Sequence, residues 1–294
     1  MTVLVGFRPG ESSADALALG AVLARSSGQP LALAAVVPQA WPAPSMARID
    51  AEYVGWSAEH AAAALEEAKG RIEPDVEVSC HRVAGRSVSS AVLELARSLG
   101  VSIIVLGSAP ETALGRITVG SAANQLAHSS EVPLALATRG FGGADHGSGG
   151  ARVSRVTCAF AGTPDSAVVV REAAALAGRL GADLRVLTVG LRNPPMIPPE
   201  VGLDAEDEVL AQWREQMAVA QKQVLADLDV PAEAQISVGD DLHAALVSAG
   251  WAETEVLALG SSAPGPLARV FLGSRATKFV KHSPVPVVLL PLHS

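Results

Sequence analysis

The chain contains one pattern twice, and a shift of 153 residues superposes the two occurrences, as Val3 falling on Val156 shows. The same shift brings together the pairs Leu106-Gly107-Ser108 with Leu259-Gly260-Ser261, Gly120-Ser121 with Gly273-Ser274, and Val132-Pro133 with Val285-Pro286. A chance match of apolar residues would not keep one offset at separate places. The fold is therefore constrained to two copies of one unit.

The length of 294 residues suits two domains of ordinary size. We expect copy one at residues 1–139 and copy two at residues 152–294. Residues 140–151 between them are rich in Gly and Ser, which is typical of a flexible linker.

Within each copy, short apolar runs alternate with amphipathic stretches, which predicts βαβ units and a parallel sheet covered by helices on both faces. In copy one we predict strands at 2–7, 31–37, 76–82, 102–107 and 132–138, and helices at 12–27, about 50–69, 87–99 and 120–129. The fold class is α/β, with two Rossmann-like domains of five parallel strands each. Ligands of such sheets bind beyond the carboxyl ends of the strands.

Composition narrows the classes of function. Hydrophobic residues make up 49% and charged residues 18%, which disfavours disorder. The net charge of −8 argues against nucleic acid as a partner. The two cysteines, Cys80 and Cys158, form no disulfide framework, and the N-terminal residues do not resemble a signal peptide, so we expect a cytoplasmic protein. The apolar runs are too short to span a membrane.

The segment after the fourth strand carries the pattern with the most chemical meaning. Gly107-Ser108 ends that strand, and Gly120-Ser121 opens the next helix. A helix start offers free backbone N–H groups, glycine admits a phosphate close to the backbone, and serine adds a hydroxyl donor. Copy two repeats the pattern with Gly260-Ser261 and Gly273-Ser274. A turn followed by a helix cap accounts for the same glycines without any ligand, and this alternative stays open.

These loops resemble the nucleotide loop of the universal stress protein family, which reads G-x2-G-x9-G-S/T after the fourth strand. The last strands, Val-Pro-Leu-Ala-Leu and Val-Pro-Val-Val-Leu-Leu, also resemble those of the family. The resemblance covers nearly the whole chain twice. It implies the adenine-nucleotide-binding α/β fold, a role in the stress response, ATP or another adenine nucleotide as ligand, and last strands that meet at a dimer seam. We therefore expect an internal pseudo-dimer of the two copies, with a homodimer of whole chains and an unidentified protein client as further partners.

Both copies depart from the family pattern. The middle glycine of the loop is replaced by Pro110 in copy one and Ala263 in copy two, and the expected adenosine-contacting Asp by Arg8 and Ala161. These changes weaken the case for a nucleotide site. Copy two adds Arg275 after its Gly-Ser pair. From this charge we predict that copy two holds the stronger anion site.

The other candidate residues give weaker evidence of a function. No combination of nucleophile, base and orienting acid is visible, so catalysis is not expected. Asp241 and His243 suit a helix start better than a metal site, and no metal site is predicted. The four tryptophans, Trp41, Trp56, Trp213 and Trp251, are interpreted as core or seam residues. A nucleotide hydrolase or transferase and an interaction module with vestigial loops stay as alternatives to a stress-response regulator.

Overall fold

The computed structural model describes residues 1–8, 12–39, 48–141, 150–192, 203–260 and 273–291. Copy one contains β1 (Thr2–Gly6), α1 (Ser12–Ser27), β2 (Leu31–Pro38), α2 (Arg48–Gly70), β3 (Val78–Gly85), α3 (Val88–Leu99), β4 (Val101–Leu106), α4 (Ser121–Ala127) and β5 (Leu134–Leu136). Copy two contains β6 (Arg155–Ala159), α5 (Pro164–Leu180), β7 (Asp183–Leu191), α6 (Leu203–Ala226), β8 (Ala232–Gly239), α7 (Leu242–Ser248), β9 (Val256–Gly260), α8 (Ser274–His282) and β10 (Val287–Leu290).

The predicted α/β fold is confirmed, and every element expected in copy one is present. The largest difference is the strand expected at 76–82, which the structure has at Val78–Gly85. Helix starts follow the expected chemistry. Thr163 caps α5 ahead of Pro164, and Asp241 caps α7 by accepting a hydrogen bond from the Ala244 N–H at 2.8 Å.

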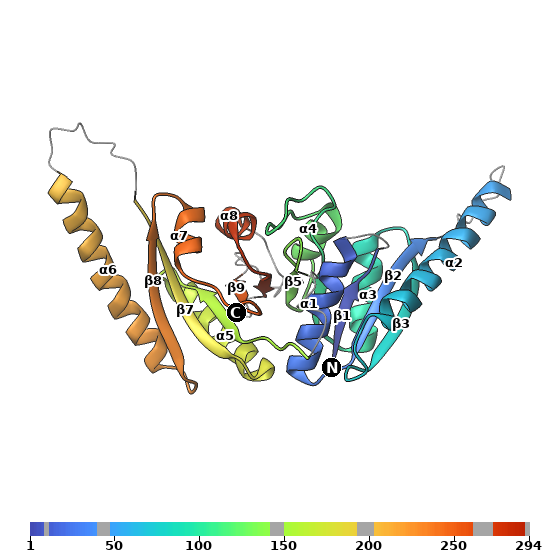
Figure 1. Cartoon of the computed structure of the whole chain (residues 1–294), viewed down its shortest axis with the longest axis horizontal. Helices are drawn as coiled ribbons and strands as arrows, with labels where there is room; N and C mark the ends of the chain where they lie inside the picture. The colour runs from blue at the N-terminus through green and yellow to red at the C-terminus, as the bar shows by residue number, and fades with distance from the viewer. Residues whose placement is uncertain (9–11, 40–47, 142–149, 193–202, 261–272, 292–294) are drawn as a thin grey trace.

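The strands form one ten-stranded sheet in the order β3-β2-β1-β4-β5-β10-β9-β6-β7-β8. Neighbouring strands within each copy are parallel. Helices α1, α2, α5 and α6 cover one face, and α3, α4, α7 and α8 cover the other. Figure 1 shows α2 and α6 at the two far ends of this assembly, with α1 near its centre.

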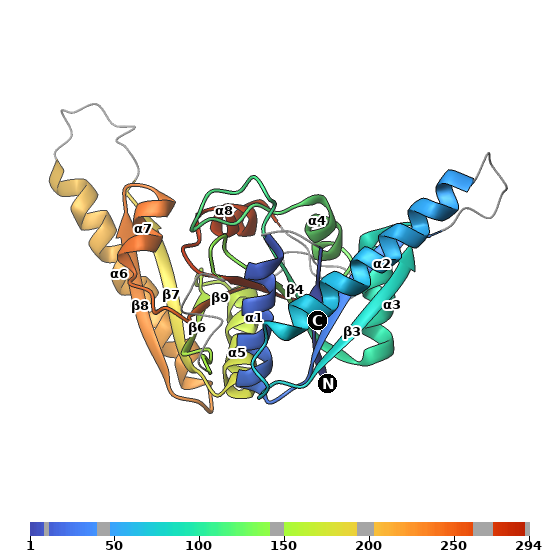
Figure 2. The ribbon, with the colours of Figure 1, turned by 45° about the vertical axis from the view of Figure 1, so that its right-hand side comes forward.

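The two copies meet through their last strands. β10 pairs antiparallel with β5, and Val288 lies opposite Ala135. On one face α1 packs against α5 (Figure 2). The apolar clusters on both faces contain residues from both copies, so each core runs across the seam. Beside α1, the Val153 N–H donates to Ser26 Oγ at 2.8 Å, which ties the first residues of copy two to copy one.

Copy two contains a buried ionic network. Arg185 and Glu255 are 2% and 0% exposed, and Arg185 Nη2 lies 2.6 Å from Glu255 Oε1. Arg155 Nη2 contacts the second oxygen of Glu255 at 2.7 Å. Arg185 Nη1 also donates to the carbonyls of Ala249 and Gly250 at the end of α7, at 2.8 Å each. The network therefore fixes α7 to the sheet with its buried charges paired.

A second polar cluster joins the copies. The two Nη atoms of Arg116 each lie 3.2 Å from a ring nitrogen of His243, on α7 of the other copy. The His243 and His282 rings are 6.2 Å apart. Burial, with Arg116, Lys281 and His243 adding repulsion and Asp241 opposing it, lowers the pKa of His282 below its usual 6.5. Both imidazoles thus sit in surroundings that contain a fixed positive charge.

No helix within the described residues is long and apolar enough to cross a membrane.

Glu255→Ala should lower the free energy of unfolding of copy two by about 3–5 kcal/mol, because it leaves the buried Arg185 guanidinium without its carboxylate. The matched control is Ser102→Ala, since Ser102 lies at the corresponding position of copy one. That change removes one serine hydroxyl and should cost about 1 kcal/mol. Urea unfolding followed by circular dichroism measures both, and equal losses would contradict a special role for the network.

The chain should lose stability as the pH falls below about 6.5. Because the pKa of His282 is lowered in the folded protein, the unfolded chain takes up the proton first, and acid therefore favours unfolding. His282→Asn should make the melting temperature less sensitive to pH between about pH 8 and pH 5.5, the range in which histidine titrates. His128→Asn, at an exposed histidine of copy one, serves as the control. The expectation fails if both variants keep the wild-type pH dependence.

Candidate functional site

A cavity of about 670 Å³ opens in copy one where β1 and β4, adjacent in the sheet, send their connections to opposite faces. In open parallel sheets this switch in strand order leaves a crevice at the carboxyl ends. Its walls come from the ends of β1, β2 and β4, from the loop after β4, and from α2, α3 and the start of α4. The volume is within the range of small-molecule sites.

The loop after β4 is held from behind by the strand at the seam. Ser108 is 4% exposed, and its hydroxyl donates to the Ala137 carbonyl at 2.8 Å. The Gly115 N–H donates to the Arg139 carbonyl at 2.8 Å, and the Arg139 N–H donates to the Arg116 carbonyl at 2.9 Å. Gly115 has a φ of +70°, a conformation that favours glycine. The shape of the loop therefore depends on the chain beyond β5.

The structure brings the four predicted residues of copy one together around the cavity. Gly107, Ser108, Gly120 and Ser121 all line it. Gly120 is the N-cap of α4 with an extended backbone and no side-chain cap, and Ser121 is exposed. The Ser108 hydroxyl proton is already donated to the protein, so Ser121 is the serine of this set whose side chain faces solvent.

Two substituted positions also line the cavity. Arg8 is exposed at its rim, and its backbone N–H is fixed by Ser13 Oγ at 3.1 Å. Pro110, which replaces the middle glycine of the loop, is exposed and contributes to the wall. The cavity therefore persists with both departures in place, and it carries a cation where the family pattern has an acid.

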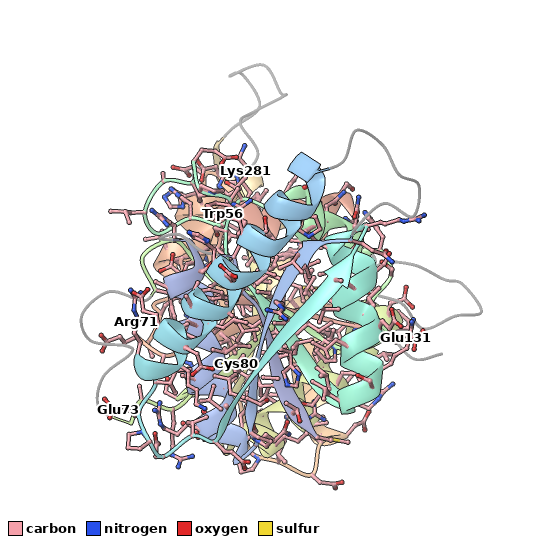
Figure 3. The ribbon with its side chains drawn as sticks, turned by 90° about the vertical axis from the view of Figure 1, so that its right-hand side faces the viewer. Trp56, Arg71, Glu73, Cys80, Glu131 and Lys281 are labelled. Atoms are coloured by element: carbon pink, nitrogen blue, oxygen red, sulfur yellow. The ribbon has the colours of Figure 1, made fainter. Side chains whose placement is uncertain are left out.

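Helix α2 supplies residues that the sequence did not indicate. Trp56, Ser57, His60 and Ala61 line the cavity from this helix. The interpretation of Trp56 as a core or seam residue is wrong, because it is 55% exposed, with its ring centroid 3.9 Å from that of His60. Figure 3 shows Trp56 on the upper part of α2, away from Cys80 on β3. An aromatic residue in a helical stretch with many alanines was the available signal.

Copy two is described only in part at the corresponding place. Gly260 ends β9, and Gly273 is the N-cap of α8, where Ser274 and Arg275 are exposed. Ser261, Ala263 and the rest of that loop lie outside the described residues, as does Trp41. Arg116, in the loop of copy one, contacts His243 across the seam and does not line the cavity.

Asp241 and the two cysteines lie outside the cavity and have structural roles. Asp241 caps a helix, as the sequence indicated. Cys158 is buried, and burial raises the pKa of its thiol to about 12. Cys80 Sγ lies 3.6 Å from the Leu65 carbonyl beneath α2, and burial raises its pKa also. Raised pKa values keep both thiols protonated near neutral pH.

Comparison with known proteins gives a consistent result. The Universal stress protein family profile matches residues 1–137 and again residues 153–291. A universal stress protein of Mycobacterium tuberculosis is 40% identical over 296 aligned positions, covering 99% of this chain and 100% of the relative. The crystal structure of a universal stress protein from Archaeoglobus fulgidus covers 99% of this chain and 98% of its own at 17% identity, with a TM-score of 0.61.

A universal stress protein solved in complex with cAMP matches 36% of this chain and 75% of its own, at 23% identity and a TM-score of 0.30. The two matches to the family profile and the full-length relative together identify the family of this chain. The chain therefore belongs to the universal stress protein family, as a tandem member that carries the family domain twice.

Proposed function

We propose that this protein acts in the stress response by binding an adenine nucleotide in the cavity of copy one. The observation that carries the proposal is the cavity itself, which combines an apolar floor with a cation and an exposed aromatic ring at its rim. Ala34, Ala35 and Val37 of β2 form part of the floor. An apolar cavity with a few convergent polar groups is the usual form of a small-molecule site.

The rim residues suit the two ends of a nucleotide. The Trp56 ring lines the cavity, and aromatic side chains stack on bases of every kind. The Arg8 guanidinium forms no hydrogen bond or ion pair among the described residues, which leaves its donors available to a phosphate. Ser121 adds a hydroxyl on the α4 side of the cavity.

A regulatory role fits this site better than turnover. His60 and Glu111 line the cavity, and within the described residues no hydrogen bond links them into a base and an activated nucleophile. A bound nucleotide would also contact three separate segments, after β1, after β4 and on α2, and so could stabilise their arrangement. The homodimer of whole chains and the protein client stay predictions.

Titration calorimetry with ATP tests the proposal. Wild-type protein should bind ATP, and Arg8→Ala should weaken the affinity about tenfold, which equals about 1.4 kcal/mol. Added salt should weaken wild-type binding more than that of the variant, because salt screens the charge on Arg8. Arg71→Ala is the matched control, since Arg71 is an exposed arginine at the far end of α2, paired with Glu67 (Figure 3).

Phosphate release in the same samples separates binding from hydrolysis. We expect binding without release, and release at a steady rate would favour the hydrolase alternative. Absence of ATP binding at low salt would contradict the proposal.

A further inference from the structure

Helices α2 and α6 occupy equivalent places in the two copies, and their buried residues give the register between them. On α2, Leu65 and Ala68 are 2% and 3% exposed, and on α6 Gln221 and Val224 are 2% and 5% exposed. Both pairs are three residues apart. Gln221 Nε2 donates to carbonyls of β7 and β8, and the Leu65 carbonyl contacts β3. Leu65 therefore matches Gln221, and Ala68 matches Val224.

With this register, the side chains of the two helices differ in size one and two turns before Leu65 and Gln221. Ala61 and Ser57, which line the cavity of copy one, match Met217 and Trp213 in copy two. Copy one thus has two small residues on the helix face that looks into the cavity. Copy two has two of the largest apolar side chains on the same face.

The contacts of Trp213 and Met217 show where these side chains go. A methyl group added to Gly190, near the end of β7, would lie 2.6 Å from Cζ3 and 2.7 Å from Cη2 of Trp213. The indole ring therefore rests directly on the backbone of Gly190. The matching residue in copy one is Val37, which lines the cavity.

Met217 fills the neighbouring space. A methyl group added to Gly162, in the turn after β6, would lie 2.9 Å from Cε and 3.1 Å from Sδ of Met217. Gly162 has a φ of +71°, so the turn itself also depends on glycine. In copy two, two glycines thus receive two large side chains at the carboxyl end of the sheet.

We propose that Trp213 and Met217 occupy in copy two the space that copy one leaves for its ligand, so that each chain binds one nucleotide. These two residues, with Ser57 and Ala61 as their counterparts, determine which copy binds. The inference rests on the proposed function for the number of nucleotides bound, while the occupation of copy two can be measured without a ligand.

A free nucleotide competes with the Trp213 ring for this space at a disadvantage. An occupant that belongs to the chain loses no translational freedom on binding, whereas a free nucleotide must pay that cost and also displace the ring. A ligand of ordinary affinity should therefore not enter copy two while Trp213 stays in place.

Exchange of the two residue pairs tests the proposal with ATP as the probe. Titration calorimetry should give one ATP per chain for wild type and two for Trp213→Ser with Met217→Ala. The reverse exchange, Ser57→Trp with Ala61→Met, should abolish binding. Val209→Ser with Val219→Ala is the matched control, because it also shortens two α6 side chains, both exposed, and should leave one ATP per chain. Two ATP per wild-type chain, or a folded Trp213→Ser, Met217→Ala variant that still binds one, would overturn the inference.

A ligand-free measurement covers the case in which wild type binds no ATP or the opened variant does not fold. Acrylamide quenching of tryptophan fluorescence should decrease in Trp56→Phe, because an exposed indole is removed, and should increase in Trp213→Phe, because a half-buried indole packed on Gly190 is removed. A decrease in both variants would place Trp213 in solvent and overturn the inference. Failure of ATP binding with the expected quenching would reject only the proposed function.

Discussion

The antiparallel pairing of β5 with β10 is the interaction on which the rest of the molecule depends. It removes the apolar inner edge of each five-stranded sheet, and exposed edges of that kind invite aggregation. The same pairing fixes the chain beyond β5, where the carbonyls of Ala137 and Arg139 hold the loop that walls the cavity. The side chain of Arg116, in the same loop, contacts His243 of copy two. One segment of copy one thus serves both the seam and the cavity.

Much of this arrangement could be predicted from the sequence, because it depends on the periodicity of apolar residues and on the spacing of the Gly-Ser pairs. Apolar runs give the strands, and the Gly-Ser pairs give the loop ends, which is why Gly107 and Gly120 were found at the cavity. The contribution of α2 could not be obtained in this way. Periodicity identifies the helix face that packs against a sheet, but it does not show whether small residues such as Ser57 and Ala61 leave space there. That space depends on how far the helix lies from the strands.

The two copies differ in the side chains that occupy corresponding buried positions. Where copy one has Ala32 and Ser102, copy two has Arg185 and Glu255, joined in a buried network that anchors α7. A buried ion pair stabilises little in total, but its geometry admits few alternatives once both charges must be satisfied. Together with Trp213 against Gly190, this gives copy two a polar anchor on one face of the sheet and a large apolar ring at its carboxyl end. Copy one has smaller residues, Ser57 and Ala61, on the face of α2 that lines its cavity.

Sequence reasoning favoured copy two as the stronger site because of Arg275, and that order stays a prediction, whereas the proposed site in copy one rests on space for a ligand. Arg275 is exposed, and the attraction between an exposed cation and an anion is worth about 1 kcal/mol or less. Apolar contact with a ligand contributes about 25 cal/mol for each Å² buried, so a cavity of suitable size can contribute several times more. A side chain that fills the cavity removes that larger contribution, whatever charge remains at the loop. In copy one, Arg8 and a space of suitable size occur together, and this combination is the basis of the proposed site.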